Sequence, residues 1–395
     1  MKKVFYYTFD GITDHLGQSQ VLPYIFGCSD KNKYHLFSHE KNLKQAKQDT
    51  ELQKQLAEHS VSWSAAQFMY GKSIKKLLVT SLGILRMYKI IFTFKPDILH
   101  GRGFIPSVIL AVYSKIFNTP FIYDFRSFSV EEWHEIGAYP RNSLLHKFLT
   151  RIDRWTLKSA SCVVVLTYSA KEMLLETNDL QNIHVIPTSV QAIEPFQYRK
   201  NGEEPKKLFK FVYSGGAQYP YEFKLAIEFL HRLGLIFPIE LTIYNKADVH
   251  LIENLLLDLS PSFSYKILNL PHQELLANLP NFDCAIFLID VTPARSTCCP
   301  TKLGEFLSAG LPILANTGIG IADDIQKKYG SILFIDHLIK STDDIIESSS
   351  KLNEVKDFIS NSEVHFRSSK KAFNEVFEIK IAISSYSKVY QSISG

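Results

Sequence analysis

Residues 300–325, PTKLGEFLSAGLPILANTGIGIADDI, decide the fold more than any other stretch of this chain. They follow an apolar segment, 284–289, with the length of a buried strand, and a polar loop, 290–299. Pro300 suits the first turn of a helix because its missing N–H is not needed there, and Gly310 ends that helix a few turns later. The sequence therefore predicts a strand, a loop and a helix in succession.

The start of this helix is suited to a phosphorylated ligand. Free N–H groups and the positive end of the helix dipole attract an anion, and Lys302 adds a full charge. Glu305, one turn further on, could accept hydrogen bonds from a sugar or ribose diol. The alternative is an ordinary helix on which Lys302 and Glu305 form a solvated pair. On these residues alone the two interpretations are equally good.

Length and composition limit the class of protein. A chain of 395 residues predicts two domains, and 46% hydrophobic with 21% charged residues is typical of a soluble globular protein. The net charge of +4 does not indicate a nucleic-acid partner. The five cysteines include no C-x-x-C pair, which favours a reducing compartment without a disulfide framework or a zinc site. Apolar runs are too short for a signal peptide or a membrane span, so we expect a cytoplasmic protein.

Apolar runs of strand length alternate with segments of helical periodicity, which indicates an α/β fold with parallel sheets. The first set of strands is expected at 3–8, 34–38, 61–64, 97–100, 121–124, 162–167 and 184–186. The helices between them are expected at 18–27, 43–58, 74–94, 105–117, 143–158 and 169–177. A second set of strands is expected at 209–213, 239–244, 265–268, 283–289, 312–316 and 331–335.

A polar stretch rich in proline and charge, 189–207, separates the two sets and indicates a linker. The tail, 352–394, is expected to be helical. This order predicts Rossmann-like, doubly wound domains at 1–190 and 206–360, and C-terminal helices at 361–395 that pack back towards the first domain. We expect the two domains to face each other across a cleft, with ligands at the carboxyl ends of the strands.

Glycines and polar or charged residues stand at or just after the ends of several expected strands. In the first domain these residues are Gly17, Gln18, His100, Arg102, Asp124 and Arg126. A lone charged residue at a strand end is usually part of a structural pair, but the clustering at two neighbouring strand ends makes an active-site edge an equally good interpretation. In the second domain, Gly215 and Gly216 permit close backbone approach to a diphosphate, which Lys224 could neutralise.

Residues 72–95 carry six basic and no acidic side chains, with apolar residues at helical spacing. One interpretation is a helix that packs on the sheet and has a basic outer face. The other is a patch that contacts anionic lipid head groups or a lipid-diphosphate acceptor. Several enzyme classes are excluded because the chain has no Walker loop, HExxH, GxSxG or protein-kinase signature. It also has no Asp-x-Asp, so we expect no metal-bridged nucleotide-sugar site.

The pattern P-x-K-x-x-E-x-x-x-x-G-x-P at 300–312, followed by a strand and a G-x-G turn, resembles the donor-site motif of glycosyltransferase family 4, the glycosyl transferases group 1. The loop DGITDHLGQSQ at 10–20 is similar to that of some bacterial members. The resemblance covers essentially the whole chain. It implies the GT-B fold, in which two Rossmann-like domains face each other across a cleft.

The resemblance also implies roles for individual residues in donor binding. Glu305 corresponds to the last glutamate of the family's E-x7-E motif, which binds the ribose hydroxyls of the donor. Lys302 is implied to lie near the donor diphosphate, and Lys224 to stabilise it as it leaves, in a loop lined by Gly215 and Gly216.

Other implied roles concern the acceptor side. Gly17 and Gln18 belong to the loop that closes over donor and acceptor, and His100 and Arg102 line the same edge. Asp124, with Arg126 nearby, stands where the family often has a histidine, and could orient a donor or acceptor hydroxyl.

Two further segments depart from the family's pattern. Thr297 stands where the first glutamate of E-x7-E is expected, and it cannot supply a carboxylate to the transferred sugar. Tyr219 and Tyr221 occupy the segment where the family has an arginine partner to Lys224.

The function implied is transfer of a sugar from a nucleotide-sugar donor to a glycan or lipid-linked acceptor in bacterial surface polysaccharide synthesis. Configuration would be retained, and neither a metal nor a cofactor would be needed. The alternatives are an inactive GT-B protein that binds nucleotide sugar or acts as a scaffold, and a nucleotide-sugar epimerase. A place at the inner face of the cell membrane is the alternative to a free cytoplasmic location. The sequence does not identify the donor's base or sugar, nor the acceptor.

Overall fold

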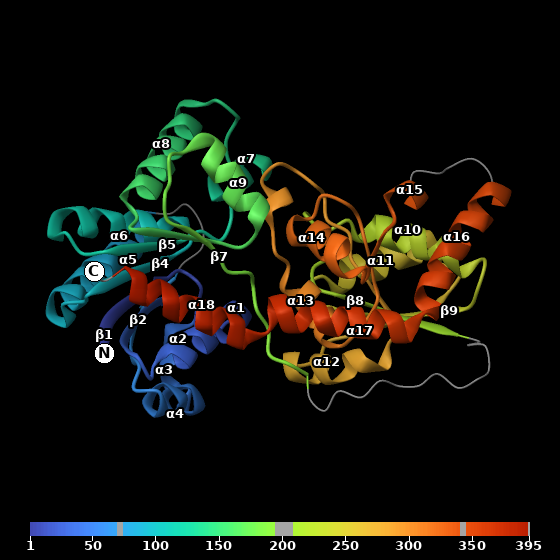
Figure 1. Ribbon diagram of the computed structural model, residues 1–395, viewed down its shortest axis with the longest axis horizontal. Helices are drawn as coiled ribbons and strands as arrows, with labels where there is room; N and C mark the ends of the chain where they lie inside the picture. Colours follow the sequence, from blue (N-terminus) through green and yellow to red (C-terminus); the bar gives the residue numbers. More distant parts are fainter. Residues whose placement is uncertain (69–73, 194–207, 340–344, 394–395) are drawn as a thin grey trace. The chain divides into compact units, whose positions relative to one another are not determined.

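The computed structural model describes residues 1–68, 74–193, 208–339 and 345–393 (Figure 1). The chain divides into two compact units. The first comprises Met1–Thr188 with Ile379–Gly395, and the second comprises Ser189–Glu378. Each unit contains one parallel sheet with helices packed against it.

The sheet of the first unit has seven parallel strands in the order β3-β2-β1-β4-β5-β6-β7. They are β1 (Lys2–Thr8), β2 (Asn32–Glu40), β3 (Ser62–Gln67), β4 (Ile98–Arg102), β5 (Phe121–Asp124), β6 (Cys162–Val165) and β7 (Ile183–Val185). Strand order reverses at β1, which has β2 on one side and β4 on the other. Such a reversal leaves a crevice at the carboxyl ends of the strands, where ligands bind in doubly wound folds.

Helices complete the first unit on both sides of this sheet. They are α1 (His15–Gln20), α2 (Leu22–Cys28), α3 (Leu43–Gln48), α4 (Thr50–Glu58), α5 (Ile74–Phe94), α6 (Phe104–Phe117), α7 (Ser129–Glu135), α8 (Leu144–Ser159), α9 (Tyr168–Thr177) and α18 (Ile379–Ser392). Val4 and Tyr6 belong to one buried cluster and Phe5 and Tyr7 to another, because successive strand side chains point to opposite faces. Both faces of β1 are therefore buried, as is usual in parallel sheets.

The C-terminal helix α18 belongs to the core of the first unit. Its residues Tyr386 and Tyr390 lie in the same buried cluster as Tyr6. It also packs on α2, where Gly27 leaves room for Ile383: a Cβ atom at position 27 would lie 2.3 Å from Ile383 Cδ1. The last helix therefore completes a core that the first strand begins.

The second unit has six parallel strands in the order β10-β9-β8-β11-β12-β13. They are β8 (Phe209–Ser214), β9 (Ile239–Tyr244), β10 (Ser264–Leu268), β11 (Cys284–Ile286), β12 (Ile313–Ala315) and β13 (Ile332–Phe334). Its helices are α10 (Phe223–Gly234), α11 (Val249–Leu259), α12 (His272–Asn278), η1 (Leu279–Asn281), η2 (Arg295–Thr297), α13 (Thr301–Ser308), α14 (Gly320–Tyr329), α15 (Asp336–Ile339), α16 (Ile345–Ser360), α17 (Ser362–Ala372) and η3 (Phe373–Phe377). Strand order reverses at β8, so this unit also has a switch point.

The predicted α/β class, with two doubly wound parallel sheets and a helical tail, is confirmed. Some boundaries differ for local reasons. The helix expected at 43–58 is two helices, because Asp49 leaves helical geometry and its carboxylate accepts a hydrogen bond from Leu52 N at 3.0 Å. Similarly, β6 ends at Val165 because Thr167 caps α9. The short helix α7 was not predicted. In the described part of the chain, no helix has the length and hydropathy needed to cross a bilayer.

Candidate functional site

Asp124, the last residue of β5, is fully buried among three basic side chains. Its Oδ1 lies 3.3 Å from Arg126 Nη1, and its Oδ2 lies 3.4 Å from Arg102 Nη1 and 3.7 Å from His100 Nε2. Burial alone would raise the pKa of Asp124. The neighbouring charges, led by Arg126, outweigh burial and hold the pKa well below its ordinary value. Asp124 is therefore a carboxylate at neutral pH, and four of the residues expected at this edge are together.

The register of the sheet explains why these residues meet. Thr8, Arg102 and Asp124 are paired across β1, β4 and β5, so the ends of the three strands stand level. Asp10 follows β1 directly, and its Oδ2 accepts a hydrogen bond from Arg102 Nε at 2.9 Å. Arg102 thus bridges carboxylates from two loops and fixes both at the carboxyl edge of the sheet.

His100 points into the core of the first unit. Its Nδ1 lies 2.7 Å from the hydroxyl of Tyr390, and its ring packs against Tyr6 with a centroid distance of 4.3 Å. Burial lowers the pKa of His100, so the imidazole is neutral at physiological pH. His100 therefore packs beside the Asp124 carboxylate on the side of the buried core.

Sequence analysis did not identify Glu40, which holds the loop after β1. Glu40 ends β2 and is fully buried. Its Oε1 accepts a hydrogen bond from Ile12 N at 2.8 Å, and its Oε2 accepts one from Thr13 Oγ1 at 2.8 Å. A carboxylate at the end of an apolar strand beside the first strand is the signal that could have revealed it.

Gly17 and Gln18 shape the same loop. A Cβ atom at position 17 would lie 2.2 Å from the carbonyl oxygen of Gly11, so only glycine fits. Gln18 Nε2 donates a hydrogen bond to the carbonyl oxygen of Ile12 at 2.7 Å. The loop is therefore closed on itself by its own residues.

A cavity of about 340 Å³ lies beside this loop, within the first unit. Its lining residues are Phe9, Asp10, Asp14, His15, Leu16, His39, Lys41 and Phe68. The rings of Phe9 and His39 stack with centroids 4.1 Å apart, and Phe68 meets Phe9 edge-on. Burial lowers the pKa of His39 to about 4, so its ring is neutral at pH 7. The cavity combines aromatic faces with carboxylates and was not predicted from the sequence.

In the second unit, Lys302 lies in the first turn of α13 and is only 8% exposed. Its ammonium nitrogen is 4.0 Å from the centroid of the Tyr221 ring and 5.2 Å from that of Tyr213. Among the described residues, Nζ has no hydrogen-bond partner. Burial lowers the pKa of Lys302 to about 7. A Cβ atom at Gly215 would lie 2.6 Å from Nζ, so the lysine and the glycine loop are in direct contact.

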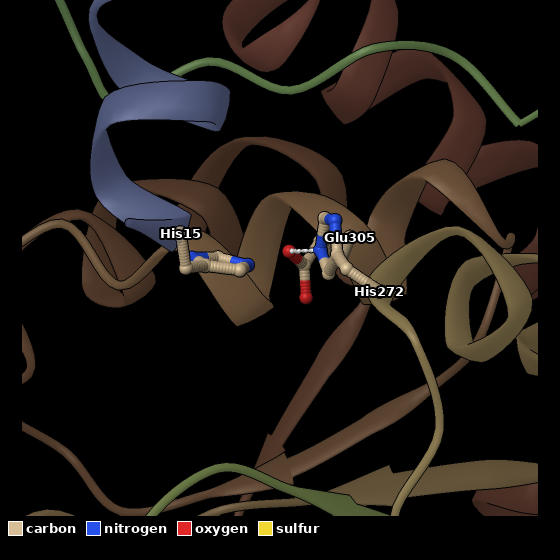
Figure 2. A group of neighbouring side chains, drawn as sticks. All are labelled: His15, His272 and Glu305. Atoms are coloured by element: carbon tan, nitrogen blue, oxygen red, sulfur yellow. Dashed lines mark hydrogen bonds and ion pairs between the residues drawn. The ribbon is translucent and has the colours of Figure 1, made fainter. Parts of the chain in front are cut away.

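Glu305, one turn further along α13, is also buried. Figure 2 shows its carboxylate beside His272, whose Nε2 lies 2.8 Å from Glu305 Oε1. His272 is the first residue of α12, after β10, and sequence analysis did not identify it. The structure does not contain the solvated Lys302–Glu305 pair that was the alternative interpretation, because both side chains are buried.

The loop after β8 is held in a conformation that requires glycine. Gly215 has φ +111°, a region that residues with a side chain rarely adopt. Its carbonyl oxygen accepts a hydrogen bond from Asn245 Nδ2 at 2.8 Å. Asp248 accepts one from Ala217 N at 2.9 Å, which is the largest cause of the lowered pKa of Asp248. The hydroxyl of Tyr213 donates a hydrogen bond to the carbonyl oxygen of Gly216 at 2.6 Å. The loop is therefore preorganised beside Lys302.

The loop before α13 supplies Arg295 and Thr297. The guanidinium carbon of Arg295 lies 4.7 Å from the centroid of the Tyr219 ring. Each of the two tyrosines noted in the sequence therefore has a cation over its ring, since Lys302 stands over Tyr221. Thr297 is buried, and its hydroxyl donates to the carbonyl oxygen of Ala294 at 2.7 Å. Thr297 thus stabilises a turn. Arg295 is a basic group in addition to Lys302, and sequence analysis did not identify it.

Lys224 lies on the surface of the second unit. It is exposed on the first turn of α10, and its ammonium group is 3.7 Å from Glu228 Oε1, one turn along the same helix. Lys302 is therefore in contact with Gly215, whereas Lys224 forms an ion pair with Glu228.

Comparisons with known proteins agree with this architecture. The family model for Glycosyltransferase Family 4 matches residues 51–192. Among curated protein sequences, none matches this chain significantly. Sucrose-phosphate synthase from Thermosynechococcus elongatus has a similar structure, with a TM-score of 0.72 and 10% identity over 100% of this chain and 99% of that one.

Two further solved structures are similar over nearly their whole length. Anabaena Alr3699/HepE in complex with UDP has a TM-score of 0.67 and 11% identity, covering 99% of this chain and 100% of that one. The apo form of the lipopolysaccharide outer core galactosyltransferase WaaB has a TM-score of 0.64 and 12% identity, covering 99% of each chain. At such identities, these structures establish the fold.

The fold is therefore that of the GT-B class, with two Rossmann-like units. The match over 51–192 confirms the resemblance to glycosyltransferase family 4 for that part of the chain, and the similar structures show the GT-B fold over the whole of it.

Proposed function

We propose that the second unit binds a nucleotide-sugar donor, with the diphosphate against Lys302. The observation that carries the proposal is a buried ammonium group with no hydrogen-bond partner among the described residues, in contact with Gly215. A buried charge without a hydrogen-bond partner is costly, the Glu305 carboxylate offsets only part of that cost, and a bound anion would offset more of it. The N-terminal amides of α13 add donors at the same place. Anabaena HepE, a structure of similar fold, holds UDP, which supports a nucleotide as the ligand.

The groups around Lys302 suit the rest of such a donor. Gly215 and Gly216 would let the diphosphate approach the backbone, and Arg295 would supply a second positive charge. Glu305, held by His272, would accept hydrogen bonds from the ribose hydroxyls. Lys224 would contribute only after leaving Glu228, and Thr297 would contact the donor without supplying a carboxylate.

The transfer that we propose retains configuration and needs neither a metal nor a cofactor. The bond between the anomeric carbon and the diphosphate oxygen breaks, and a bond from an acceptor oxygen to that carbon forms. The acceptor's hydroxyl proton passes to the leaving diphosphate, whose negative charge Lys302 stabilises. Asp124, a carboxylate flanked by Arg102 and Arg126, would orient a sugar hydroxyl.

We propose a glycan or lipid-linked saccharide as the acceptor, bound in the 340 Å³ cavity of the first unit. Phe9 and Phe68 offer apolar ring faces, and Asp10 and Asp14 offer hydrogen-bond acceptors, a combination that suits a sugar ring. Gly17 and Gln18 shape the loop at its side. WaaB acts on the lipopolysaccharide outer core, which supports surface polysaccharide as the product class.

Location inside the cell, with contact to the inner face of the membrane through 72–95, belongs to the same proposal. Lys72 lies outside the described residues, and of the basic residues whose side chains are described, Arg86 donates to the carbonyl oxygen of Ala65 at 3.3 Å while Lys89 is exposed.

A screen of UDP-, GDP- and CMP-linked sugars by thermal shift tests donor binding, because a bound ligand stabilises by mass action. For the sugar that stabilises the protein, calorimetry should show the affinity of Lys302→Ala reduced by about tenfold to a hundredfold. Lys266→Ala is the matched control, since Lys266 is exposed and paired with Glu240 in the same unit. The proposal fails if no nucleotide sugar binds, or if the two variants lose affinity equally.

Thr297 favours a second candidate, a GT-B protein that binds nucleotide sugar without transferring it. Its hydroxyl is occupied by the Ala294 carbonyl, and no carboxylate stands at this position. Slow hydrolysis of the bound donor in wild type, lost in Lys302→Ala, would exclude it. Product analysis without acceptor would detect an epimerase.

A further inference from the structure

We propose that the outer face of α8 binds the surface of an anionic lipid bilayer. This helix, Leu144–Ser159, lies in the first unit, and its side chains are described throughout. The inference does not depend on sugar transfer or on residues 72–95.

The inner face of α8 makes the contacts that hold the helix against the rest of the first unit. Leu149 and Ile152 join a small apolar cluster, made with Phe104, Val130, Trp133 and Tyr139. Asp153 Oδ1 accepts a hydrogen bond from the hydroxyl of Tyr123 at 3.0 Å, and His146 Nε2 lies 3.0 Å from Glu131 Oε1. The helix is thus anchored to α6, α7 and β5 by one face, and the opposite face is not used by the fold.

Large apolar side chains occupy part of that opposite face. Leu144 is 87% exposed, Phe148 is 58% exposed and Trp155 is 40% exposed. They are spaced i, i+4 and i+11, which places them in one stripe over three turns. Single exposed apolar residues are normal on protein surfaces, but a continuous stripe of them marks an interaction site.

A basic stripe runs beside the apolar one. Lys147, Arg151, Arg154 and Lys158 are all exposed and are spaced i, i+4, i+7 and i+11. At about 100° per residue, this spacing puts them in the sector next to Leu144 and the rest of the apolar stripe. Within 141–159, where every residue is described, Asp153 is the sole acid, and it faces Tyr123. The outer face therefore has a positive charge that no carboxylate of the helix offsets.

This pairing of stripes fits a bilayer better than other partners. Tryptophan, phenylalanine and leucine can enter the boundary between head groups and acyl chains, while lysine and arginine stay at the level of the phosphates. A nucleic acid would use the basic stripe alone. A second copy of the helix would bring like charges together. Charge complementarity therefore favours anionic lipid as the partner of this face.

Cosedimentation of the full-length protein with vesicles tests the inference. Phosphatidylcholine vesicles with about 30% phosphatidylglycerol should bind wild type at least about tenfold more tightly than phosphatidylcholine alone. The double variants Leu144→Ser/Phe148→Ser and Arg151→Gln/Arg154→Gln should each lose about tenfold in affinity. All four side chains are exposed, so both variants should keep the wild-type melting temperature.

Matched controls lie on the surface of the second unit. Leu235→Ser/Leu257→Ser removes two leucines that are each 70% exposed, and Arg367→Gln/Lys371→Gln removes two exposed charges. Both should bind vesicles as wild type does. Trp155 fluorescence should shift to the blue with anionic vesicles, and Trp155→Phe should remove that shift.

Three results would overturn the proposal. One is equal binding to neutral and anionic vesicles. Another is full binding by Leu144→Ser/Phe148→Ser, which would indicate a polyanion ligand of the basic stripe. The last is a dimer in solution that only the α8 variants dissociate, which would make this face a contact between copies.

Discussion

The Nζ atom of Lys302 lies 4.0 Å from the centroid of the Tyr221 ring and, within the described part of the chain, has no hydrogen-bond partner. An aromatic face attracts an ammonium group, but it does not replace the water that burial removes. Burial therefore lowers the pKa of Lys302 to about 7, so the protonated and neutral forms coexist near physiological pH. A bound anion would favour the protonated form.

Replacing this lysine should stabilise the protein. In the unfolded chain the pKa is 10.5 and in the folded chain it is about 7, so between these values the unfolded state binds more protons and wild-type stability rises with pH. Lys302→Met removes the buried charge and should be more stable at pH 7.5 by about 1–3 kcal/mol. Thermal unfolding at several pH values should show this difference shrinking as the pH approaches 10. A difference independent of pH would contradict the assignment, and Lys266→Met should show none.

Donor binding should take up a proton. Because the free lysine is mostly neutral at pH 8 and a diphosphate would raise its pKa, binding should weaken as the pH rises above about 7. Calorimetry at pH 8 in two buffers of different ionisation enthalpy measures the protons exchanged. Wild type should take up a large fraction of one proton, and Lys302→Met should take up none. Equal uptake by both proteins would place the titrating group elsewhere.

Gly215→Ala should displace the lysine. The new Cβ would lie 2.6 Å from Lys302 Nζ, and alanine is strained at φ +111°. Gly330→Ala is the matched control, because Gly330 also has a positive φ, of +72°, but its Cβ would meet no atom within 4 Å. Both variants should lose about 1 kcal/mol of stability, and only Gly215→Ala should also weaken nucleotide binding, by about tenfold. If Gly330→Ala weakened binding as much, backbone strain would be the cause.

Local sequence was sufficient to predict some of these features. Apolar runs revealed the strands because parallel strands are buried on both faces. The start of the helix that carries Lys302, after a strand and a loop, suggested an anion site because that pattern is local, and this site stays a prediction. The clustering of His100, Arg102, Asp124 and Arg126 followed from two neighbouring strand ends.

Other partners depend on packing between distant segments, which no local pattern records. His272 is 33 residues from Glu305, and Glu40 is 28 residues from Ile12. Burial of Lys302 was not predicted, because its position on the helix was equally compatible with a solvated side chain. The rings of Tyr213 and Tyr221, which come from a strand end and a loop, exclude that water.

Asp124→Asn should lower stability strongly. The amide is nearly the same size, but it leaves Arg102 and Arg126 without their shared carboxylate, a loss of about 3–5 kcal/mol for a buried pair. Because the folded pKa of Asp124 is below its ordinary value of 3.8, its contribution is present above that pH and is lost as the pH falls further. The difference in unfolding free energy between wild type and variant should therefore be constant from about pH 5 to 7 and should begin to narrow as the pH falls below 3.8, without closing by about pH 3. Asp97→Asn, at an exposed carboxylate that accepts from Lys3 N, should cost far less.

Glu40→Gln should loosen the loop after β1 while leaving donor binding intact. Both oxygens of Glu40 accept hydrogen bonds, from Ile12 N and Thr13 Oγ1, and glutamine has one oxygen to replace the two. Of the groups that donate to the two carboxylate oxygens, which include Ser38 Oγ, those facing the new amide nitrogen would lose their acceptor, at a cost of about 1–3 kcal/mol. Amide hydrogen exchange should become faster in 10–18 and stay unchanged in the second unit. The acceptor's KM should rise, because Asp10 and Asp14 line the cavity of the first unit, and the donor's Kd should not change. Faster exchange throughout the first unit would instead show that Glu40 stabilises the whole sheet.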